Sequence, residues 1–150
     1  MRDKIRHSGD HQLNPVTLRA SGVLKYRTGY CYAKSHLLAA LLRANGIPTG
    51  LCYQRLAKAG EPGVFFLHGL NAVYLKEYGW YRIDARGNRP DLSADCSPPL
   101  EALPYSPSVP GEADLSEIWA EPLPCIVGVL TRYSDYARVN ANLPDVELIR

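Results

Sequence analysis

Residues 28–48 read TGYCYAKSHLLAALLRANGIP and predict one amphipathic helix, from Tyr30 to Asn45. Leucines recur at helical spacing and give the segment an apolar face, and its alanines are strong helix formers. An Asn-Gly pair is typical of a left-handed helix end, and Pro48 prevents the helix from continuing. Cys31 therefore falls in the first turn, where unpaired N–H groups and the positive end of the helix dipole stabilise a thiolate.

The chain after this helix alternates strand-like segments with turns. Each segment is rich in apolar and aromatic residues, and a Tyr-Gly pair before the last one is typical of a tight turn. Consecutive strands joined by short turns predict an antiparallel sheet, and a helix packed on such a sheet predicts an α+β fold. The predicted strands are Thr49–Leu56, Gly63–Leu67, His68–Leu75 and Trp80–Ile83.

The remaining segments carry weaker patterns. Residues 1–7 are consistent with the end of a short helix, and residues 8–22 with a loop. The proline-rich residues 89–112 predict an extended surface segment rather than a second domain. Residues 115–119 predict one more strand, and Pro124–Arg132 predicts a short helix.

The overall composition limits the classes of function. A length of 150 residues predicts one domain, and a formal net charge of +2 is too small to indicate nucleic acid or an anionic membrane as a partner. No stretch approaches the ~20 apolar residues that cross a bilayer, and the first residues lack the apolar segment of a secretory signal. We therefore expect a cytoplasmic protein, unless a leader has been removed.

The four cysteines, at positions 31, 52, 96 and 125, form no familiar metal or disulfide pattern. None belongs to a Cys-x-x-Cys pair, and their spacing is not that of a zinc site. In a reducing compartment we expect free thiols. The chain also lacks a glycine-rich phosphate motif, so we expect neither a cofactor nor a metal.

Two further residues are placed to assist a reactive Cys31. His68 begins a predicted strand, and Asp84 ends another in the sequence WYRID. Adjacent antiparallel strands can hold these two side chains side by side, so that the acid accepts an imidazole N–H and fixes the tautomer. The arrangement predicts a nucleophile, a base and an orienting acid. Taken singly, each has a structural alternative: a buried helical cysteine, a hydrogen-bonded histidine, and an aspartate that opens a turn.

The other three histidines are weaker candidates for such a site. His7 and His11 fall in or next to the predicted loop. His36 lies five residues after Cys31, which turns it to a different face of the helix. Only His68 therefore enters the predicted site.

The chain resembles the transglutaminase-like superfamily in two segments, TGYCYAKSHLLAALLRANGIPTGLCY and LHGLNAVYLKEYGWYRIDARGN. A glycine precedes the cysteine, the leucine-rich helix ends in Arg43 and a Gly-Ile-Pro sequence, and Trp80 precedes the aspartate. The opening RDKIRHSGD also resembles a family segment upstream of the cysteine. The resemblance covers residues 1–90 well and the last third of the chain weakly.

This resemblance implies a papain-like fold with a Cys–His–Asp triad in that chain order, which here is Cys31, His68 and Asp84. It also implies an oxyanion hole, for which the Cys31 backbone N–H is one donor. Gln12 is the predicted side-chain donor, because a glutamine precedes the nucleophile in papain-like enzymes; a loop amide is the open alternative. The resemblance implies a single transglutaminase-like domain over residues 1–150. Family members usually carry helices before the opening segment, so we expect this domain to be either shortened at its start or a compact version.

The implied chemistry is acyl transfer on an amide bond of a peptide or protein. The thiolate attacks the carbonyl, an amine leaves, and an acyl-thioester forms. Release by water makes a peptidase or amidase, which we favour, and release by an amine makes a cross-linking transglutaminase.

Other interpretations remain open at this point. The same triad could belong to a deamidating transglutaminase or an acetyltransferase, and the fold could be a non-catalytic peptide-binding module. A metal site is a further alternative, although it would lack the local ligand pairs usual for zinc. Its ligands would be Cys31, Cys52, His68 and Asp84.

Overall fold

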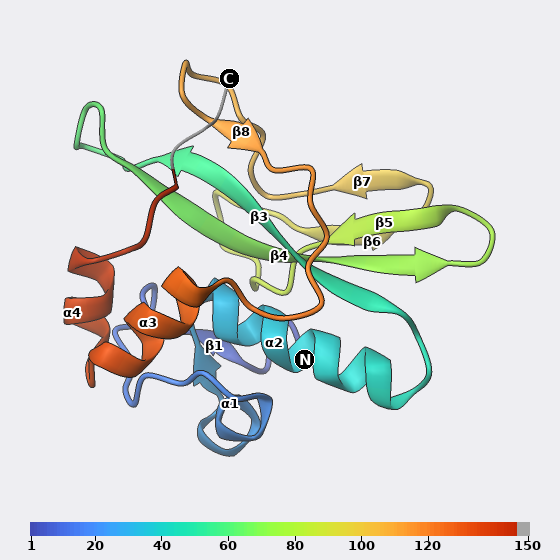
Figure 1. Cartoon of the computed structure of the whole chain (residues 1–150), viewed down its shortest axis with the longest axis horizontal. Helices are drawn as coiled ribbons and strands as arrows, with labels where there is room; N and C mark the ends of the chain where they lie inside the picture. The colour runs from blue at the N-terminus through green and yellow to red at the C-terminus, as the bar shows by residue number, and fades with distance from the viewer. Residues whose placement is uncertain (147–150) are drawn as a thin grey trace.

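The computed structural model describes residues 1–146 and has the mixed α+β fold that the sequence predicts. A four-stranded antiparallel sheet has the order β5-β4-β3-β8, and the helices lie along one side of it (Figure 1). The strands of this sheet are β3 (Thr49–Ala57), β4 (Phe65–Leu75), β5 (Gly79–Ile83) and β8 (Ala113–Asp114), and the helices are α1 (Ala20–Tyr26), α2 (Cys31–Ala44), α3 (Pro124–Arg132) and α4 (Tyr136–Ala141).

Helix α2 packs on β3 and β4 with the first half of its length. Leu37 and Ala39 are buried there, whereas Leu41 is 41% exposed, so the leucine stripe seen in the sequence is only partly covered. Full burial of a side chain such as Leu37 contributes about 1.5–3 kcal/mol. The best-packed part of the helix is therefore the part that carries Cys31.

A short parallel strand pair ties the N-terminal segment to the start of α2. It replaces the helix end that the sequence suggested for residues 1–7. β1 (Arg6–His7) pairs with β2 (Thr28–Gly29), so that His7 lies opposite Gly29. Only Tyr30 separates Gly29 from Cys31, and the pairing thus brings His7 close to the helix start.

A buried lysine fastens the same N-terminal segment to α2. Lys34 is fully buried, and its ammonium donates to the backbone carbonyls of Arg2, over 2.8 Å, and of Ile5. Burial lowers the pKa of Lys34 to about 8. Since a buried charge is costly unless it is paired or hydrogen-bonded, these bonds hold the segment one helical turn from Cys31.

Three other segments differ from the expectation. β4 is one continuous strand where two were predicted, because its apolar run and its alternating half are both largely buried. The proline-rich segment contains a hairpin of β6 (Asp95–Ser97) and β7 (Leu100–Ala102). Residues 115–119 are not a strand; the fourth strand of the sheet is β8, and Trp119 makes a single bridge to Leu51.

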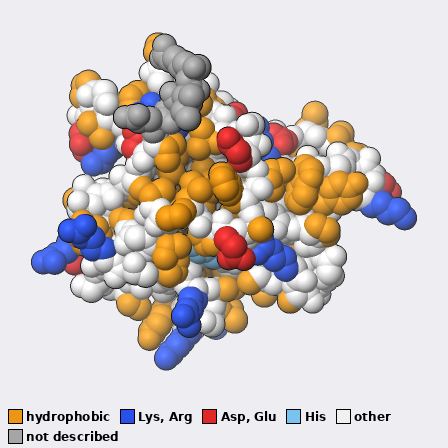
Figure 2. Space-filling view, viewed as in Figure 1, with side chains coloured by type: hydrophobic (Ala, Val, Ile, Leu, Met, Phe, Trp, Pro, Cys, Tyr) orange, Lys and Arg blue, Asp and Glu red, His pale blue; other side chains and the backbone are white. Residues whose placement is uncertain are grey.

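The surface carries no concentration of positive charge on the face shown in Figure 2. Lysine and arginine side chains lie apart from one another on this face, most of them near its edges and one beside an acidic side chain closer to the centre, while apolar side chains cover much of the centre. Within the described residues, no helix is both long and apolar enough to cross a membrane.

Candidate active site

Cys31 is the first residue of α2, and its side chain is buried where the helix meets β4. The N–H groups of a first helical turn have no partner within the helix, and the positive end of the helix dipole lies there. The backbone N–H of Gly69 on β4 donates to Cys31 Sγ over 3.4 Å. A Cβ at Gly69 would lie 2.9 Å from Cδ1 of Tyr32, so only glycine permits this approach. The helix start and the strand thus both direct N–H donors toward the thiol.

His68 and Asp84 form a buried pair beside this thiol. His68 Nε2 lies 2.6 Å from Asp84 Oδ2, and the two side chains are 3% and 1% exposed. His68 precedes Gly69 on β4, and Asp84 directly follows β5, the neighbouring strand. The other oxygen, Asp84 Oδ1, accepts the backbone N–H of Arg86 over 2.6 Å. Asp84 therefore engages Nε2 of the imidazole and leaves Nδ1 for the thiol.

Burial and charge act in opposite directions on these three groups. Burial opposes a thiolate at Cys31, but the charge and hydrogen bond of His68 outweigh it and lower the pKa of Cys31 to about 6. Burial also opposes an imidazolium, but Asp84 and Cys31 raise the pKa of His68 to about 10. Burial would raise the pKa of Asp84, yet the imidazolium holds that pKa below its ordinary value. The favoured state near neutral pH is thus a thiolate–imidazolium ion pair.

Tyr105 covers the imidazole from the proline-rich segment. Its ring meets that of His68 edge-on, with centroids 4.8 Å apart. The guanidinium of Arg86 lies 5.8 Å from the centre of the same tyrosine ring. A segment that the sequence suggested to be surface loop therefore shields the buried pair from water.

The thiol lines a cavity of about 220 Å³. Its walls come from four parts of the chain: the N-terminal segment, the junction of α2 with β4, the residues after β5, and the C-terminal residues in and after α4. The lining residues include His7, Asp10, Cys31, His68, Arg86 and Leu143. The cavity thus joins the predicted triad to groups that the sequence reasoning did not select.

A second histidine–aspartate pair lines the same cavity. His7 Nδ1 accepts the backbone N–H of Asp10 over 3.3 Å and lies 3.5 Å from Asp10 Oδ1. That oxygen accepts N–H groups from two guanidinium groups, of Arg86 at 2.7 Å and of Arg89 at 3.3 Å. The His7 imidazole lines the same cavity as the Cys31 thiol, and His7 adds to the lowering of the pKa of Cys31 after the larger contribution of His68. The sequence placed His7 in or next to a loop, whereas it lies in the two-residue strand β1 and lines the cavity.

Gln12, the predicted side-chain donor of the oxyanion hole, is not among the residues that line this cavity. It is exposed and has a left-handed backbone, with φ of 53°, in the turns that follow β1. Its role stays a prediction that this geometry does not favour. His11, one residue earlier, is also exposed.

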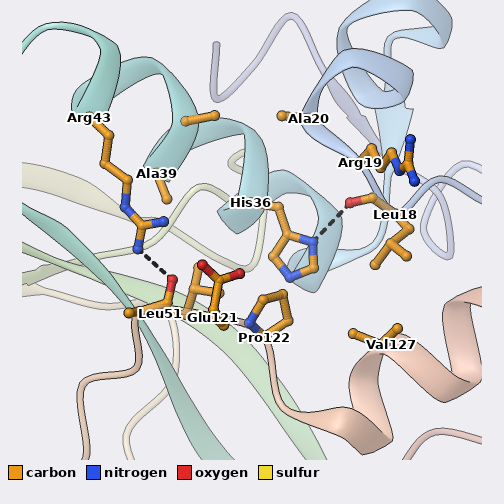
Figure 3. A pocket seen from close by; sticks show the side chains of 12 residues that line it. Leu18, Arg19, Ala20, His36, Ala39, Arg43, Leu51, Glu121, Pro122 and Val127 are labelled. Atoms are coloured by element: carbon orange, nitrogen blue, oxygen red, sulfur yellow. Dashed lines mark hydrogen bonds between the residues drawn. The ribbon is translucent and has the colours of Figure 1, made fainter.

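A larger pocket of about 400 Å³ lies along the side of α2 and contains none of the predicted site residues. Figure 3 shows the His36 ring in this pocket, with its Nδ1–H donated to the Leu18 carbonyl over 2.9 Å. Arg43 donates from its guanidinium to the Ala120 carbonyl over 2.8 Å. The lining includes no thiol, so the smaller cavity at Cys31 is the candidate active site.

The other cysteines stand apart from this chemistry. All four are free thiols, as expected. Cys52 packs with Leu70 and Ala72 in an apolar cluster separate from that of Cys31, and burial raises the pKa of Cys52 to about 11. Among the described residues, no three His, Cys, Asp or Glu side chains are grouped to hold a metal ion. The placement of Cys52 in a separate cluster does not favour the mixed metal site with Cys31, His68 and Asp84.

A cysteine at a helix start, packed on an antiparallel sheet in an α+β fold, defines the papain-like class of folds. The sequence pattern of the transglutaminase-like superfamily matches residues 1–85, a stretch that contains Cys31, His68 and Asp84. The chain belongs to this superfamily. No curated protein and no solved structure matches it.

Proposed function

We propose that this protein is a cysteine-dependent amidase or peptidase, with Cys31 as nucleophile, His68 as base and Asp84 as orienting acid. The observation that carries the proposal is the 2.6 Å bond between His68 Nε2 and Asp84 Oδ2 beside a thiol at a helix start. Such a bond leaves Nδ1 free to exchange a proton with the thiol and the leaving group. Membership of the transglutaminase-like superfamily, which is compatible with acyl transfer through cysteine, supports the same reaction class.

The reaction begins from the ion pair. The Cys31 thiolate attacks the amide carbonyl carbon, forming the C–S bond while the carbonyl electron pair moves to oxygen. The tetrahedral intermediate collapses, and the leaving amine takes the proton from His68 Nδ1. Neutral His68 then removes a proton from water, which attacks the thioester and restores the thiolate and the imidazolium. Asp84 stabilises each imidazolium without taking the proton itself.

Hydrolysis is favoured over cross-linking by the size of the cavity. A volume of about 220 Å³ leaves little room for a second protein's side chain beside the acyl group of the substrate, whereas water enters readily. Cross-linking or deamidating activity is the second candidate within this reaction class, and an amine supplied together with a glutamine-containing peptide would reveal it.

The first test is the pH dependence of iodoacetamide alkylation at Cys31, followed by peptide mass spectrometry. We expect rapid labelling down to about pH 6, with a decrease of about tenfold per pH unit below that value as the thiolate is protonated. Cys96 is exposed and serves as the comparison thiol within the same sample.

The matching variant is Cys31→Ser, assayed with amide substrates. We expect loss of turnover with an unchanged melting temperature, because serine occupies nearly the same volume but its hydroxyl is not ionised by this pair. Retained turnover would exclude Cys31 as the nucleophile. An alkylation profile at Cys31 that follows that of Cys96 would instead favour the peptide-binding module.

A further inference from the structure

We propose that His7 is the side-chain donor of the oxyanion hole, in partnership with the backbone N–H of Cys31. The inference rests on the acyl-transfer function proposed above and concerns the same cavity. A tetrahedral intermediate at Cys31 needs hydrogen-bond donors to its oxygen. His7 would take this role, for which the sequence suggested Gln12.

The position of His7 is set by the backbone. β1 pairs in register with β2, His7 lies opposite Gly29, and the chain then enters α2 at Cys31. The His7 side chain is 12% exposed and lines the cavity together with the thiol. An oxygen bound to a carbon on Sγ would form in the cavity that this ring also lines.

The protonation of the ring follows from its neighbours. The backbone N–H of Asp10 donates to His7 Nδ1 over 3.3 Å, so in the neutral ring Nδ1 is the acceptor and Nε2 carries the hydrogen. If the ring takes a second proton, Nδ1–H faces Asp10 Oδ1 at 3.5 Å, and Nε2 still carries its own. In both states Nε2–H is a donor, and it is the nitrogen not engaged by Asp10.

The ring is also held before a substrate arrives. Asp10 Oδ1 accepts from Arg86 Nη2 over 2.7 Å, and Arg86 is 4% exposed. The His7 ring also meets that of Tyr30 edge-on, with centroids 5.4 Å apart. Because these contacts fix the imidazole in the ground state, little reorganisation is needed when negative charge develops on the oxygen.

The two imidazoles thus have different tasks in the same step. When Cys31 Sγ bonds to the carbonyl carbon, the π electron pair moves to the oxygen, which accepts Nε2–H of His7 and the backbone N–H of Cys31. His7 gives up no proton. The leaving amine receives its proton from His68 Nδ1, the carbonyl re-forms, and the hydrogen bonds to the oxygen weaken.

The test compares two reactions of the same thiol. Acylation by p-nitrophenyl acetate passes through a tetrahedral oxyanion, whereas alkylation by iodoacetamide does not. The variant His7→Phe keeps a ring against Tyr30 but has no N–H, and His7→Gln restores a donor. We expect His7→Phe to slow acylation by about 10²–10³-fold with little change in alkylation at neutral pH, and His7→Gln to recover part of the loss.

The matched control is His11→Phe, which places the same substitution at an exposed residue four positions away. It should leave both reactions unchanged. Equal losses of acylation and alkylation in His7→Phe would show that His7 only positions the thiolate, and unchanged acylation would remove it from the site; either result overturns the proposal. If His7→Phe fails to fold, an acylation rate of His7→Gln no better than that of Cys31→Ser overturns it as well.

Failure of the underlying function gives a different result. Wild-type protein that forms no acetyl-Cys31 and alkylates like an ordinary thiol would refute the acyl-transfer proposal together with this one. Wild-type protein that acylates, alongside a His7→Phe variant that acylates equally well, refutes only the role of His7.

Discussion

The first 85 residues and the remainder of the chain contribute differently to the one cavity. The first part holds its reactive groups by burial and close approach: Cys31 and His68 are almost fully buried, and Gly69 brings a strand onto a helix start. The later part supplies walls, including Leu143. Its helices α3 and α4 bury apolar side chains in the same core, and the Tyr30 hydroxyl donates to the Tyr136 carbonyl over 2.7 Å. In the proposed enzyme, the nucleophile and its base lie in the first region, whereas part of the substrate-binding wall lies in the second.

Asp84→Asn should disturb the first region most. An amide cannot stabilise the imidazolium, so the pKa of His68 falls and that of Cys31 rises. We expect turnover to drop by about 10²–10⁴-fold and the alkylation profile of Cys31 to move to higher pH. The measurements are the turnover rate, the pH profile of Cys31 alkylation and, as a check on folding, the melting temperature.

The control for this change is Asp91→Asn, at an exposed surface carboxylate paired with Arg89. It should leave the rate and the profile unchanged. An Asp84→Asn variant with unaltered turnover would mean that another group orients His68.

Tyr30→Phe should affect the second region and leave the triad in place. The substitution removes the hydroxyl that binds the backbone of α4 and leaves a carbonyl without its partner. We expect a loss of about 1 kcal/mol of stability, or about 2–4 °C in melting temperature. KM should rise more than kcat falls, because the wall rather than the nucleophile is loosened.

Tyr26→Phe is the matched control, since that tyrosine is 50% exposed on α1. A kcat that falls with KM unchanged in Tyr30→Phe would contradict the division between the two regions.

The smallest effects are expected at the remaining cysteines. Cys96→Ser changes an exposed thiol and should alter neither stability nor rate. Cys52→Ala opens a small space in an apolar cluster and should cost about 1 kcal/mol of stability with turnover unchanged. Loss of turnover at constant melting temperature in either variant would show that the chemistry is not confined to Cys31.

The predictable parts of the fold are those with repeating patterns. The helix that carries Cys31 and the helix Pro124–Arg132 lie where the sequence put them, because a leucine-rich face in one and a proline start in the other are strong local signals. α4 was not predicted, although Asp135 caps it by accepting the backbone N–H of Arg138. A helix of six residues has too few positions to show a period.

Part of the candidate site could be predicted from the sequence for the same reason. Cys31, His68 and Asp84 could be selected because the sequence pattern places each at or near an end of a predicted element. His7 could not, since its strand is two residues long and its partner strand lies about twenty residues later. The signal that would have found it is the carboxylate three residues on, at Asp10, which suits a histidine held by a turn. Contacts between distant, unpatterned segments are fixed by tertiary packing alone.

The contacts of Arg86 affect how mutations in this candidate site would combine. Its backbone N–H binds the carboxylate of Asp84, and its guanidinium binds that of Asp10. A side-chain substitution at this residue keeps the backbone N–H on Asp84 but removes the guanidinium, which binds Asp10 and whose charge also lowers the pKa of Asp84. Mutations in the two pairs should therefore be coupled through residue 86. A directed-evolution library that varies His7 or Asp10 alone should then yield fewer active variants than a library in which residue 86 is varied together with them.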